Sequence, residues 1–384
     1  MRLTIVMGFF LPVPPLAGGA TEKIWNRLAQ EIAQRGHTVT VVSRLWRDLP
    51  AREVLDGVTH LRLPGRDHTR SLLRNLWRDF RWARTVLPAL PPADVVVCNT
   101  VSLPLFLKRA RPDAGRVAVV LGRMPKGQVR AYGATDLLLA TSEAVAERAR
   151  RENPRLSSRL VLFPNPIDWS LHRRASHQES NSGPLEIGYV GRIHPEKGLE
   201  ILLEAGCLLS KAKHLPDWRI TLMGPQTIQE GGGGENYITT LRTRFESQLG
   251  SRLRILPPCY GTEPLADVYG GLSIFCYPSR AARGEGLSIA PLEAMAAGAV
   301  PVLSLLDCYR DIITPGVNGL QFDQDSAHAV VELAQQFEAL LGDATTRRSL
   351  AIQAQKSVER YDYQHTVTHL LREFARLTPG SGNS

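Results

Sequence analysis

The stretch "EIGYVGRIHPEKGLEILLEA", residues 186–205, reads as one strand, one loop and one helix, and this order decides the fold class. Its first seven residues are apolar enough for a buried strand, and leucine and isoleucine recur at helical spacing from Leu199 onwards. A strand that leads through a short loop into a helix is the repeating unit of parallel sheets covered by helices. The stretch therefore predicts an α/β protein.

The same alternation of short apolar runs and amphipathic segments extends along the chain. In the segment 21–36, for example, Ile24, Leu28 and Ile32 share one helix face and Gly36 ends the helix. A chain of 384 residues exceeds one ordinary core. We therefore expect two parallel sheets, each covered by helices on both faces. The strand-like runs are 3–9, 38–44, 94–100, 116–122, 136–142, 159–165, 186–192, 219–225, 252–258, 273–279 and 299–305.

Two polar stretches interrupt this alternation. The segment "HRRASHQESNSGP", residues 172–184, has no apolar periodicity and is predicted to link two domains, 1–170 and 184–360. The segment "QTIQEGGGGEN", residues 226–236, is predicted to be a mobile surface loop inserted after a strand. The last residues, "PGSGNS" at 379–384, are expected to fray.

The composition is that of a folded soluble chain, with 43% hydrophobic and 22% charged residues. Its five cysteines are widely spread and form no C-x-x-C pair, which fits a reducing compartment. The apolar run at the N-terminus, "MRLTIVMGFF", is too short for a signal peptide or a membrane span. We therefore expect a cytoplasmic protein, with contact at the inner face of the membrane left open by its charge.

The positive charge is concentrated in the N-terminal half. Residues 1–170 carry 26 Lys and Arg against 14 Asp and Glu, whereas the remaining residues carry 20 against 23. This asymmetry predicts an anionic partner, which could be membrane headgroups, nucleic acid or a phosphorylated substrate. Nucleic acid is disfavoured because the sequence lacks helix-turn-helix, RNP and zinc-finger spacings.

The segment 66–90 interleaves arginines with leucines and aromatic residues. As a helix it would present an apolar stripe beside a cationic flank. Two interpretations stay open: a surface helix that contacts an anionic membrane, or a helix that packs its stripe into the core and solvates its basic face. The arginines are Arg70, Arg74, Arg78, Arg81 and Arg84, and the stripe is Leu73, Leu76, Trp77, Phe80 and Ala83.

Ligands of open parallel sheets bind beyond the carboxyl ends of the strands, so we expect the site residues to follow the strands. Gly18 and Gly19 follow the first strand and precede a helix, where backbone amides can receive an anion. A tight turn explains the glycine pair equally well. Arg192 and Lys197 lie on the loop of the opening stretch, and two cations beside a helix N-terminus suit a diphosphate.

A second loop and helix, "GEGLSIAPLEAMAAG" at 284–298, contains two acids. Glu285 precedes the helix, and Glu293 lies inside it. Amides of Gly286, Leu287 and Ser288 at the start of the helix can hold phosphate oxygens. Glu293 lies in an otherwise apolar helix, where it could bind ligand hydroxyls, and Glu285 would face a polyhydroxylated group beyond the phosphates. The alternative is a loop acid and a surface acid without a ligand.

These motifs resemble, in order and spacing, the signature of the retaining nucleotide-sugar glycosyltransferases of family four. The resembling segments are "GYVGRIHPEKG", "YPSRAARGEGLSIAPLEAMAAGAVPVLS" and "PGVNGL", and the most specific element is the pair Glu285 and Glu293. The resemblance covers nearly the whole chain. It implies the GT-B fold, two Rossmann-like domains facing across a cleft, with "LFPNPID" at 162–168 crossing between them and a helix at about 361–378 returning to the first domain.

The resemblance also implies roles. Arg192 and Lys197 would bind the donor diphosphate, Glu293 the ribose hydroxyls and Glu285 the transferred sugar. Amides of the segment 286–288 would contact phosphate or sugar, and the Gly18–Gly19 loop would match the family's N-terminal glycine loop. The loop after the strand 252–258 would place Cys259 and Tyr260 beside the base. No metal or other cofactor is implied, because arginine, lysine and helix dipoles neutralise the diphosphate.

Two positions depart from the family pattern. Asn99 stands where the family often has a histidine; it can bond a sugar hydroxyl but cannot transfer a proton near neutral pH. The segment "LLDCYRDII" has Asp311 in place of the usual glutamate and lacks a glycine pair. Both changes bear on acceptor and sugar specificity.

The resemblance implies an enzyme that transfers a hexose, with retention, from a nucleotide diphosphate sugar to a hydroxyl acceptor. A UDP-sugar is favoured over a GDP-sugar as donor, and a lipid-linked or cell-surface glycan precursor would explain the basic surface. The open alternatives are an epimerase or phosphorylase of related fold, and a sugar-nucleotide-binding protein without catalysis.

Overall fold

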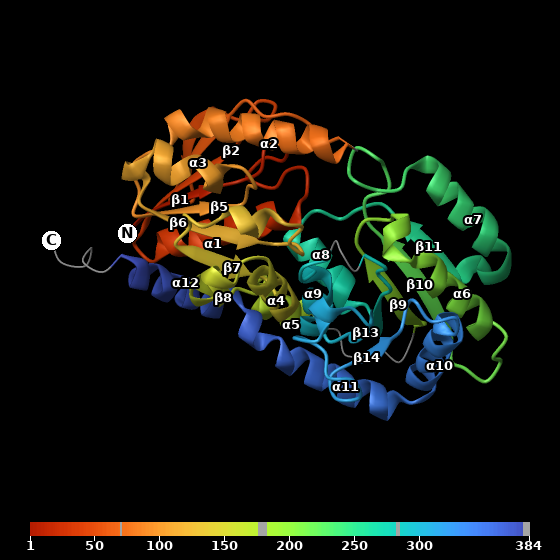
Figure 1. Cartoon of the computed structure of the whole chain (residues 1–384). Helices are drawn as coiled ribbons and strands as arrows, with labels where there is room; N and C mark the ends of the chain where they lie inside the picture. Colours follow the sequence, from red (N-terminus) through yellow and green to blue (C-terminus); the bar gives the residue numbers. More distant parts are fainter. Residues whose placement is uncertain (70, 176–182, 282–284, 379–384) are drawn as a thin grey trace. The chain divides into compact units, whose positions relative to one another are not determined.

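A computed structural model (Figure 1) describes residues 1–69, 71–175, 183–281 and 285–378. Arg70, Gly284, the terminal stretch 379–384 and part of the predicted linker therefore lie outside the described residues. The chain forms two compact units. Unit 1 comprises Met1–Pro166 and Tyr363–Ser384, and unit 2 comprises Ile167–Asp362.

Unit 1 is an eight-stranded sheet with strand order β3-β4-β2-β1-β5-β6-β7-β8. All neighbouring strands pair in parallel except β3 and β4. The elements are β1 Arg2–Val6, α1 Ala20–Gln34, β2 Thr38–Arg44, β3 Arg52–Leu55, β4 Val58–Leu63, α2 Leu72–Val86, β5 Val95–Cys98, α3 Leu103–Ala110, β6 Arg116–Leu121, β7 Leu137–Ala140, α4 Glu143–Glu152, β8 Leu160–Leu162 and α12 Tyr363–Leu377.

Unit 2 is a six-stranded sheet with order β11-β10-β9-β12-β13-β14, and every pair is parallel. Its central strands, such as Ile274–Tyr277, are apolar and fully buried, as the sequence pattern indicates, whereas Glu186 and Arg219 form an ion pair on two neighbouring strands. The elements are α5 Trp169–Ala175, β9 Leu185–Val190, α6 Leu199–Leu209, β10 Trp218–Met223, α7 Glu235–Leu249, β11 Leu253–Leu256, α8 Thr262–Gly270, β12 Ile274–Tyr277, α9 Ile289–Ala296, β13 Val300–Ser304, β14 Leu320–Phe322, α10 Ala329–Gly342 and α11 Ala344–Ser357.

The two-sheet α/β prediction is therefore confirmed, but the β3–β4 hairpin was missed. Its two-residue turn is Asp56–Gly57, with φ of 51° and 77°. Positive φ at both turn positions is the geometry that matches the twist of paired strands, and Asp-Gly is a preferred sequence for it. The dipeptide was the available signal, but the edge strand β3 is too polar and exposed to read as a buried strand.

The chain passes from unit 1 to unit 2 at 166/167, not at 170. Helix α5, at the start of the predicted linker, already belongs to unit 2. Its Trp169 Nε1 donates to the Gln355 carbonyl at 3.0 Å, and its His172 is buried. The polar sequence around these two residues gave no indication that both side chains pack against unit 2.

Helix α12 returns to unit 1 and packs against α1 (Figure 1). The side chain of Gln364 donates to Glu31 of α1 at 2.6 Å, and Arg35, the residue after α1, donates to the Thr368 hydroxyl at 2.8 Å. Leu370 and Phe374 are fully buried beneath these polar contacts. Burying each such side chain contributes about 1.5–3 kcal/mol, so α12 is an integral part of unit 1.

Helix α2 does not pack its predicted stripe into the core. Of the five stripe residues only Ala83 is buried and Phe80 is partly buried, whereas Leu73, Leu76 and Trp77 are exposed. The helix instead packs through Trp82 and Val86, which were not part of the predicted stripe. The prediction that the stripe packs into the core is therefore wrong for the N-terminal half of the helix. Among the described residues, no helix is long and apolar enough to cross a membrane.

Candidate functional site

The strand order of each sheet reverses at one point, between β1 and β5 in unit 1 and between β9 and β12 in unit 2. Loops that leave the carboxyl ends of such strands diverge to opposite sides and leave room for a ligand. Most of the predicted site residues follow these four strands. Gly18 and Gly19 follow β1, Asn99 follows β5, Arg192 and Lys197 follow β9, and Glu285 to Ser288 follow β12.

In unit 2 the two loops are joined by a buried ion pair between Lys197 and Glu285. Only 6% of the lysine side chain and 10% of the glutamate side chain are exposed. Each charge compensates the other, because an unpaired ion in such a place would be strongly unfavourable. The structure thus brings together two residues that are far apart in the sequence.

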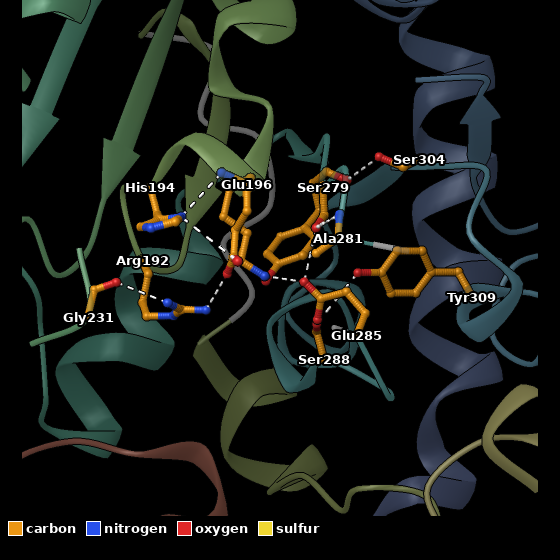
Figure 2. A network of polar contacts seen from close by, with 12 residues as sticks. Arg192, His194, Glu196, Gly231, Ser279, Ala281, Glu285, Ser288, Ser304 and Tyr309 are labelled. Atoms are coloured by element: carbon orange, nitrogen blue, oxygen red, sulfur yellow. Dashed lines mark hydrogen bonds and ion pairs between the residues drawn. The ribbon is translucent and has the colours of Figure 1, made fainter. Parts of the chain in front are cut away.

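Hydroxyl groups fix the Glu285 carboxylate from both sides (Figure 2). Ser279 donates to one oxygen at 3.0 Å, and Ser288 donates to the other at 2.8 Å. Burial alone would raise the pKa of Glu285, but the charge of Lys197 and these hydrogen bonds outweigh it and lower the pKa. Glu285 is therefore held as a carboxylate.

An aromatic ring lies beside the lysine. Its Nζ lies 5.2 Å from the ring centroid of Tyr277, which stacks on Tyr189 at 5.4 Å. Burial opposes the charge of Lys197, but Tyr277 and Glu285 outweigh it and raise the pKa. These tyrosines and Ser279 were not predicted. Ser279 follows β12 and so had a positional signal, whereas Tyr189 and Tyr277 lie within the strands β9 and β12.

Arg192 lies on the same loop as Lys197 but is more open, with 41% of its side chain exposed. It pairs with Glu196 and donates to the Gly231 carbonyl at 3.0 Å (Figure 2). The hydroxyl of Tyr189 donates to the Arg192 carbonyl at 2.8 Å. The guanidinium is thus held between Glu196 and the glycine-rich loop.

The glycine-rich loop is part of this arrangement and not the mobile insertion that we expected. The amide of Gly233 donates to the Ile193 carbonyl at 2.8 Å, and that of Gly234 donates to the Gln226 carbonyl at 2.8 Å. A Cβ at Gly232 would lie 2.4 Å from the Gln226 backbone. The glycines therefore allow a tight fold that carries the Gly231 carbonyl to Arg192.

The start of α9 is formed by Gly286, Leu287 and Ser288. Gly286 and Leu287 are buried, and Ser288 is the N-cap residue in an extended conformation. Its side chain does not cap the helix and instead binds Glu285. The helix start and the acid before it are thus adjacent, as predicted.

Glu293 is not part of the Lys197–Glu285 cluster. It is 3% exposed and lies against two other helices, with His172 Nε2 of α5 at 3.9 Å. Tyr269 of α8 also bonds it, and the pKa of Tyr269 is raised by burial and by this acid. The Glu293 side chain is thus almost closed to solvent.

Cys259 and Tyr260 follow the edge strand β11, two strands away from β9. Tyr260 is half-exposed and donates to Glu230 of the glycine-rich loop at 2.8 Å. Burial and this hydrogen bond raise the pKa of Tyr260 to about 12. The loop thereby connects Tyr260 to Arg192, whereas Cys259 is only partly buried.

In unit 1, Gly18 and Gly19 have φ of 75° and 98°, and Gly19 is the N-cap residue of α1. The carboxylate of Glu22 lies against Gly19: a Cβ there would be 2.2 Å from its Oε2. Burial, opposed by a bond to its own amide and by Arg123, raises the pKa of Glu22 to about 7. The position that we assigned to a ligand anion is taken by an acid of this chain.

Asn99 lies at the end of the neighbouring strand β5 and is half-buried. Its amide nitrogen lies 3.6 Å from Met7 Sδ, a weak contact that leaves most of its hydrogen-bonding capacity for other groups.

Among the described residues, no group of three or more His, Cys, Asp and Glu side chains is arranged to hold a metal ion.

Two protein-family models match this chain. The family model for glycosyl transferases group 1 matches residues 173–357, and the model for glycosyltransferase family 4 matches residues 18–171. The chain belongs to glycosyltransferase family 4. The family resemblance that the sequence motifs indicated is therefore confirmed, and the two matches together include most of both units.

Curated relatives of this family 4 chain are distant. It is 23% identical to the D-inositol 3-phosphate glycosyltransferase of Rhodococcus opacus over 270 residues, covering 67% of this chain and 58% of the relative. It is 26% identical to the phosphatidyl-myo-inositol mannosyltransferase of Mycobacterium tuberculosis over 245 residues, covering 62% of this chain and 60% of the relative. The matches thus span less than two thirds of these relatives.

Solved structures resemble the family 4 chain over almost its full length. Sucrose-phosphate synthase from Thermosynechococcus elongatus has a TM-score of 0.80 at 18% identity, covering 99% of this chain and 100% of the other. Anabaena HepE in complex with UDP-glucose has a TM-score of 0.71 at 17% identity, covering 98% and 100%. These likenesses show the fold, and the GT-B prediction is confirmed.

Proposed function

We propose that the protein is a retaining glycosyltransferase that moves a hexose from a nucleotide diphosphate sugar, preferably a UDP-sugar, to a hydroxyl acceptor. The observation that carries this proposal is the buried pair of Lys197 and Glu285 at the reversal point of the second sheet. A cation and an acid side by side can serve the two halves of one donor. The cation suits the diphosphate and the acid suits the sugar hydroxyls.

The diphosphate would lie between Arg192, Lys197 and the amides of Gly286, Leu287 and Ser288. Departure of the nucleoside diphosphate places negative charge on its phosphates, and preorganised cations and amides stabilise that charge. No metal is needed in this scheme. Without donor, Glu285 compensates Lys197, so the lysine stays charged and in place although it is buried.

Glu285 would then orient the transferred sugar and stabilise the positive charge that develops on it. Ser279 and Ser288 fix both carboxylate oxygens, so the acid does not reorganise during the reaction. Asn99 would bond a sugar hydroxyl without transferring a proton. Gly18 and Gly19 would contact the donor from unit 1, with Glu22 protonated or displaced.

Glu293 would bind the ribose, and Cys259 and Tyr260 would lie near the base. The ribose contact requires a local rearrangement, because the Glu293 side chain is only 3% exposed and bonds Tyr269. The relatives named for inositol phosphate and phosphatidyl-inositol acceptors support an acceptor that carries a phosphate, including a lipid-linked one.

The proposal is tested first by donor binding. UDP-glucose and UDP should raise the melting temperature of the protein more than GDP-mannose and GDP. A ligand at 100 times its Kd adds about 2.7 kcal/mol to the unfolding free energy. Arg192→Ala should remove most of this shift, whereas Arg348→Ala, an exposed arginine on α11, should leave it intact.

The second test follows the reaction itself. UDP should be released from the stabilising donor only when a hydroxyl acceptor is present, and the product should keep the anomeric configuration of the donor. Conversion of the donor sugar without an acceptor would instead identify an epimerase or phosphorylase. Binding without turnover in any acceptor extract would identify a binding protein, and no binding of any nucleotide sugar would end the proposal.

A further inference from the structure

The N-terminal half of α2 exposes apolar side chains that no other part of the described chain covers. Leu72 is 66% exposed, Leu73 is 78% exposed and Trp77 is 59% exposed. Large apolar side chains this open, and adjacent on one helix, are unusual on a protein that meets only water. Their gathering at one place indicates an interaction surface.

The exposed apolar surface continues onto α3. Trp77 stacks on Phe80 at 5.7 Å, and Phe80 meets Phe106 of α3 edge-on at 5.6 Å. Leu105 and Phe106 are themselves more than one third exposed. We call this surface the α2 patch and define it as Leu72, Leu73, Leu76, Trp77 and Phe106.

The opposite face of α2 anchors the helix, so the α2 patch cannot turn inward. Trp82 Nε1 donates to the Met7 carbonyl at 2.9 Å. The buried carboxylate of Asp79 accepts from the Ser102 amide at 2.7 Å, at the start of α3. These contacts fix the side of the helix that faces solvent.

Arginines border the α2 patch. Arg66, Arg74, Arg78 and Arg81 line a hollow of about 220 Å³ together with Trp77. Arg66, Arg74 and Arg81 are exposed, and within the described ranges they form no ion pair with a carboxylate. Arg78 donates to the Asp67 carbonyl and so also holds the preceding loop. The hollow is cationic, and the Asp67 carboxylate beside it is paired with Arg44 at 2.7 Å.

We propose that the α2 patch and its arginines dock the protein on an anionic lipid bilayer, with a lipid phosphate in the arginine-lined hollow. Exposed leucine and tryptophan beside guanidinium groups are the composition of helices that lie in the membrane interface. Tryptophan suits the level of the headgroups, and arginine is drawn to anionic leaflets. This inference is independent of the donor chemistry of unit 2.

Flotation of the full chain with lipid vesicles tests the proposal. The protein should float with vesicles of equal parts phosphatidylcholine and phosphatidylglycerol, and much less with phosphatidylcholine alone. Arg74→Ser combined with Arg81→Ser should weaken binding about 30-fold. Leu73→Ser combined with Trp77→Ser should weaken it at least tenfold, because two apolar side chains no longer enter the interface.

Matched variants separate the α2 patch from a general effect of charge or of an exposed apolar side chain. Arg155→Ser combined with Arg348→Ser removes the same charge from exposed positions elsewhere, and Ile352→Ser removes a 58% exposed isoleucine of α11. Both should float like the unaltered protein. The melting temperature of each variant without any ligand should match that of the unaltered protein, which shows that the variants are folded and keeps this test separate from that of the proposed function.

Four outcomes would overturn the proposal. The first is that the protein does not float with anionic vesicles, and the second is that the matched variants lose as much vesicle binding as the α2-patch variants. The third is that free glycerol phosphate binds without vesicles at the same affinity. The fourth is a dimer in solution that dissociates when Leu73→Ser is combined with Trp77→Ser. The last result would assign the α2 patch to a second copy of the chain.

Discussion

The two sheets reverse their strand order at corresponding points, but the residues that follow differ in kind. In unit 2 a lysine and a glutamate are interlocked, and hydroxyls and tyrosines fix them. In unit 1 the corresponding place holds a glycine loop, the half-buried Asn99 and Glu22, whose pKa of about 7 makes its charge depend on pH. One fold thus supplies a permanently charged site and a titratable one.

Under the proposed function this difference suits two roles. A diphosphate needs cations that are already in place, since reorganisation during the reaction would cost rate. The residues of unit 1 would instead contact the donor sugar through Asn99 and the Gly18–Gly19 loop, without a fixed charge. The following changes test whether the two reversal points differ in this way.

The largest effect is expected at Lys197. Lys197→Met should reduce transfer by about a hundredfold to a thousandfold, because one preorganised donor to the phosphates is lost. It should also destabilise the protein by about 3 kcal/mol, because Glu285 is left buried without its partner. Transfer assays and chemical unfolding measure the two effects.

A double-mutant cycle separates the ion pair from general damage. Lys197→Met combined with Glu285→Gln should cost clearly less stability than the sum of the two single changes, since neither variant then buries an unpaired charge. Strictly additive costs would show that the two side chains do not depend on each other.

Glu22 should give a pH-dependent effect in unit 1. Because its folded pKa is raised from 4.5 to about 7, its stabilising contribution is full below pH 4.5 and is lost as the pH rises through 7. Glu22→Gln should therefore match the original at pH 4.5 and be more stable by up to about 3 kcal/mol at pH 8. Unfolding free energies of both proteins at each pH measure this, and a difference that is constant with pH would contradict it.

A smaller effect is expected in the glycine-rich loop. Gly232→Ala should raise the KM for the donor by about tenfold with little change in kcat, because the added Cβ displaces the loop that carries Gly231 to Arg192. Gly342→Ala is the matched control, since a Cβ there meets no atom within 4 Å. An unchanged KM would show that the loop does not position Arg192.

The smallest effect on stability is expected at Asn99. Asn99→Ala should change the unfolding free energy by less than about 1 kcal/mol, because among the described residues the side-chain amide bonds a methionine sulfur and no stronger acceptor. The transfer rate should nevertheless fall by about tenfold if the amide bonds the sugar. A normal rate with several donors would remove Asn99 from the site.

The two sheets could be predicted from the sequence, because buried parallel strands are continuous apolar runs such as "VVVC" at 95–98. The sequence was also sufficient to nominate Arg192, Lys197 and Glu285, which follow strands at a reversal point. It could not predict the pairing of Lys197 with Glu285, because that contact depends on β9 and β12 being neighbours. Strand order is a property of the whole fold.

Other features depended on elements remote in the sequence. The burial of Glu293 arises from Tyr269 on α8 and His172 on α5, which no pattern around residue 293 reveals. The amphipathic period of α2 predicts a helix, but which half meets the core depends on where Met7 and Ser102 hold it. The glycine run was ambiguous because glycine serves mobile and tightly folded loops alike.

The return of α12 to unit 1 has a consequence for biosynthesis. A ribosome releases residues 1–166 first, but the helix that covers α1 follows only after all of unit 2. Until then the α1 surface around Glu31 and Arg35 lacks its partner. Nascent chains halted before α12 should therefore carry a native-like unit 2 and an N-terminal unit that chaperones still bind.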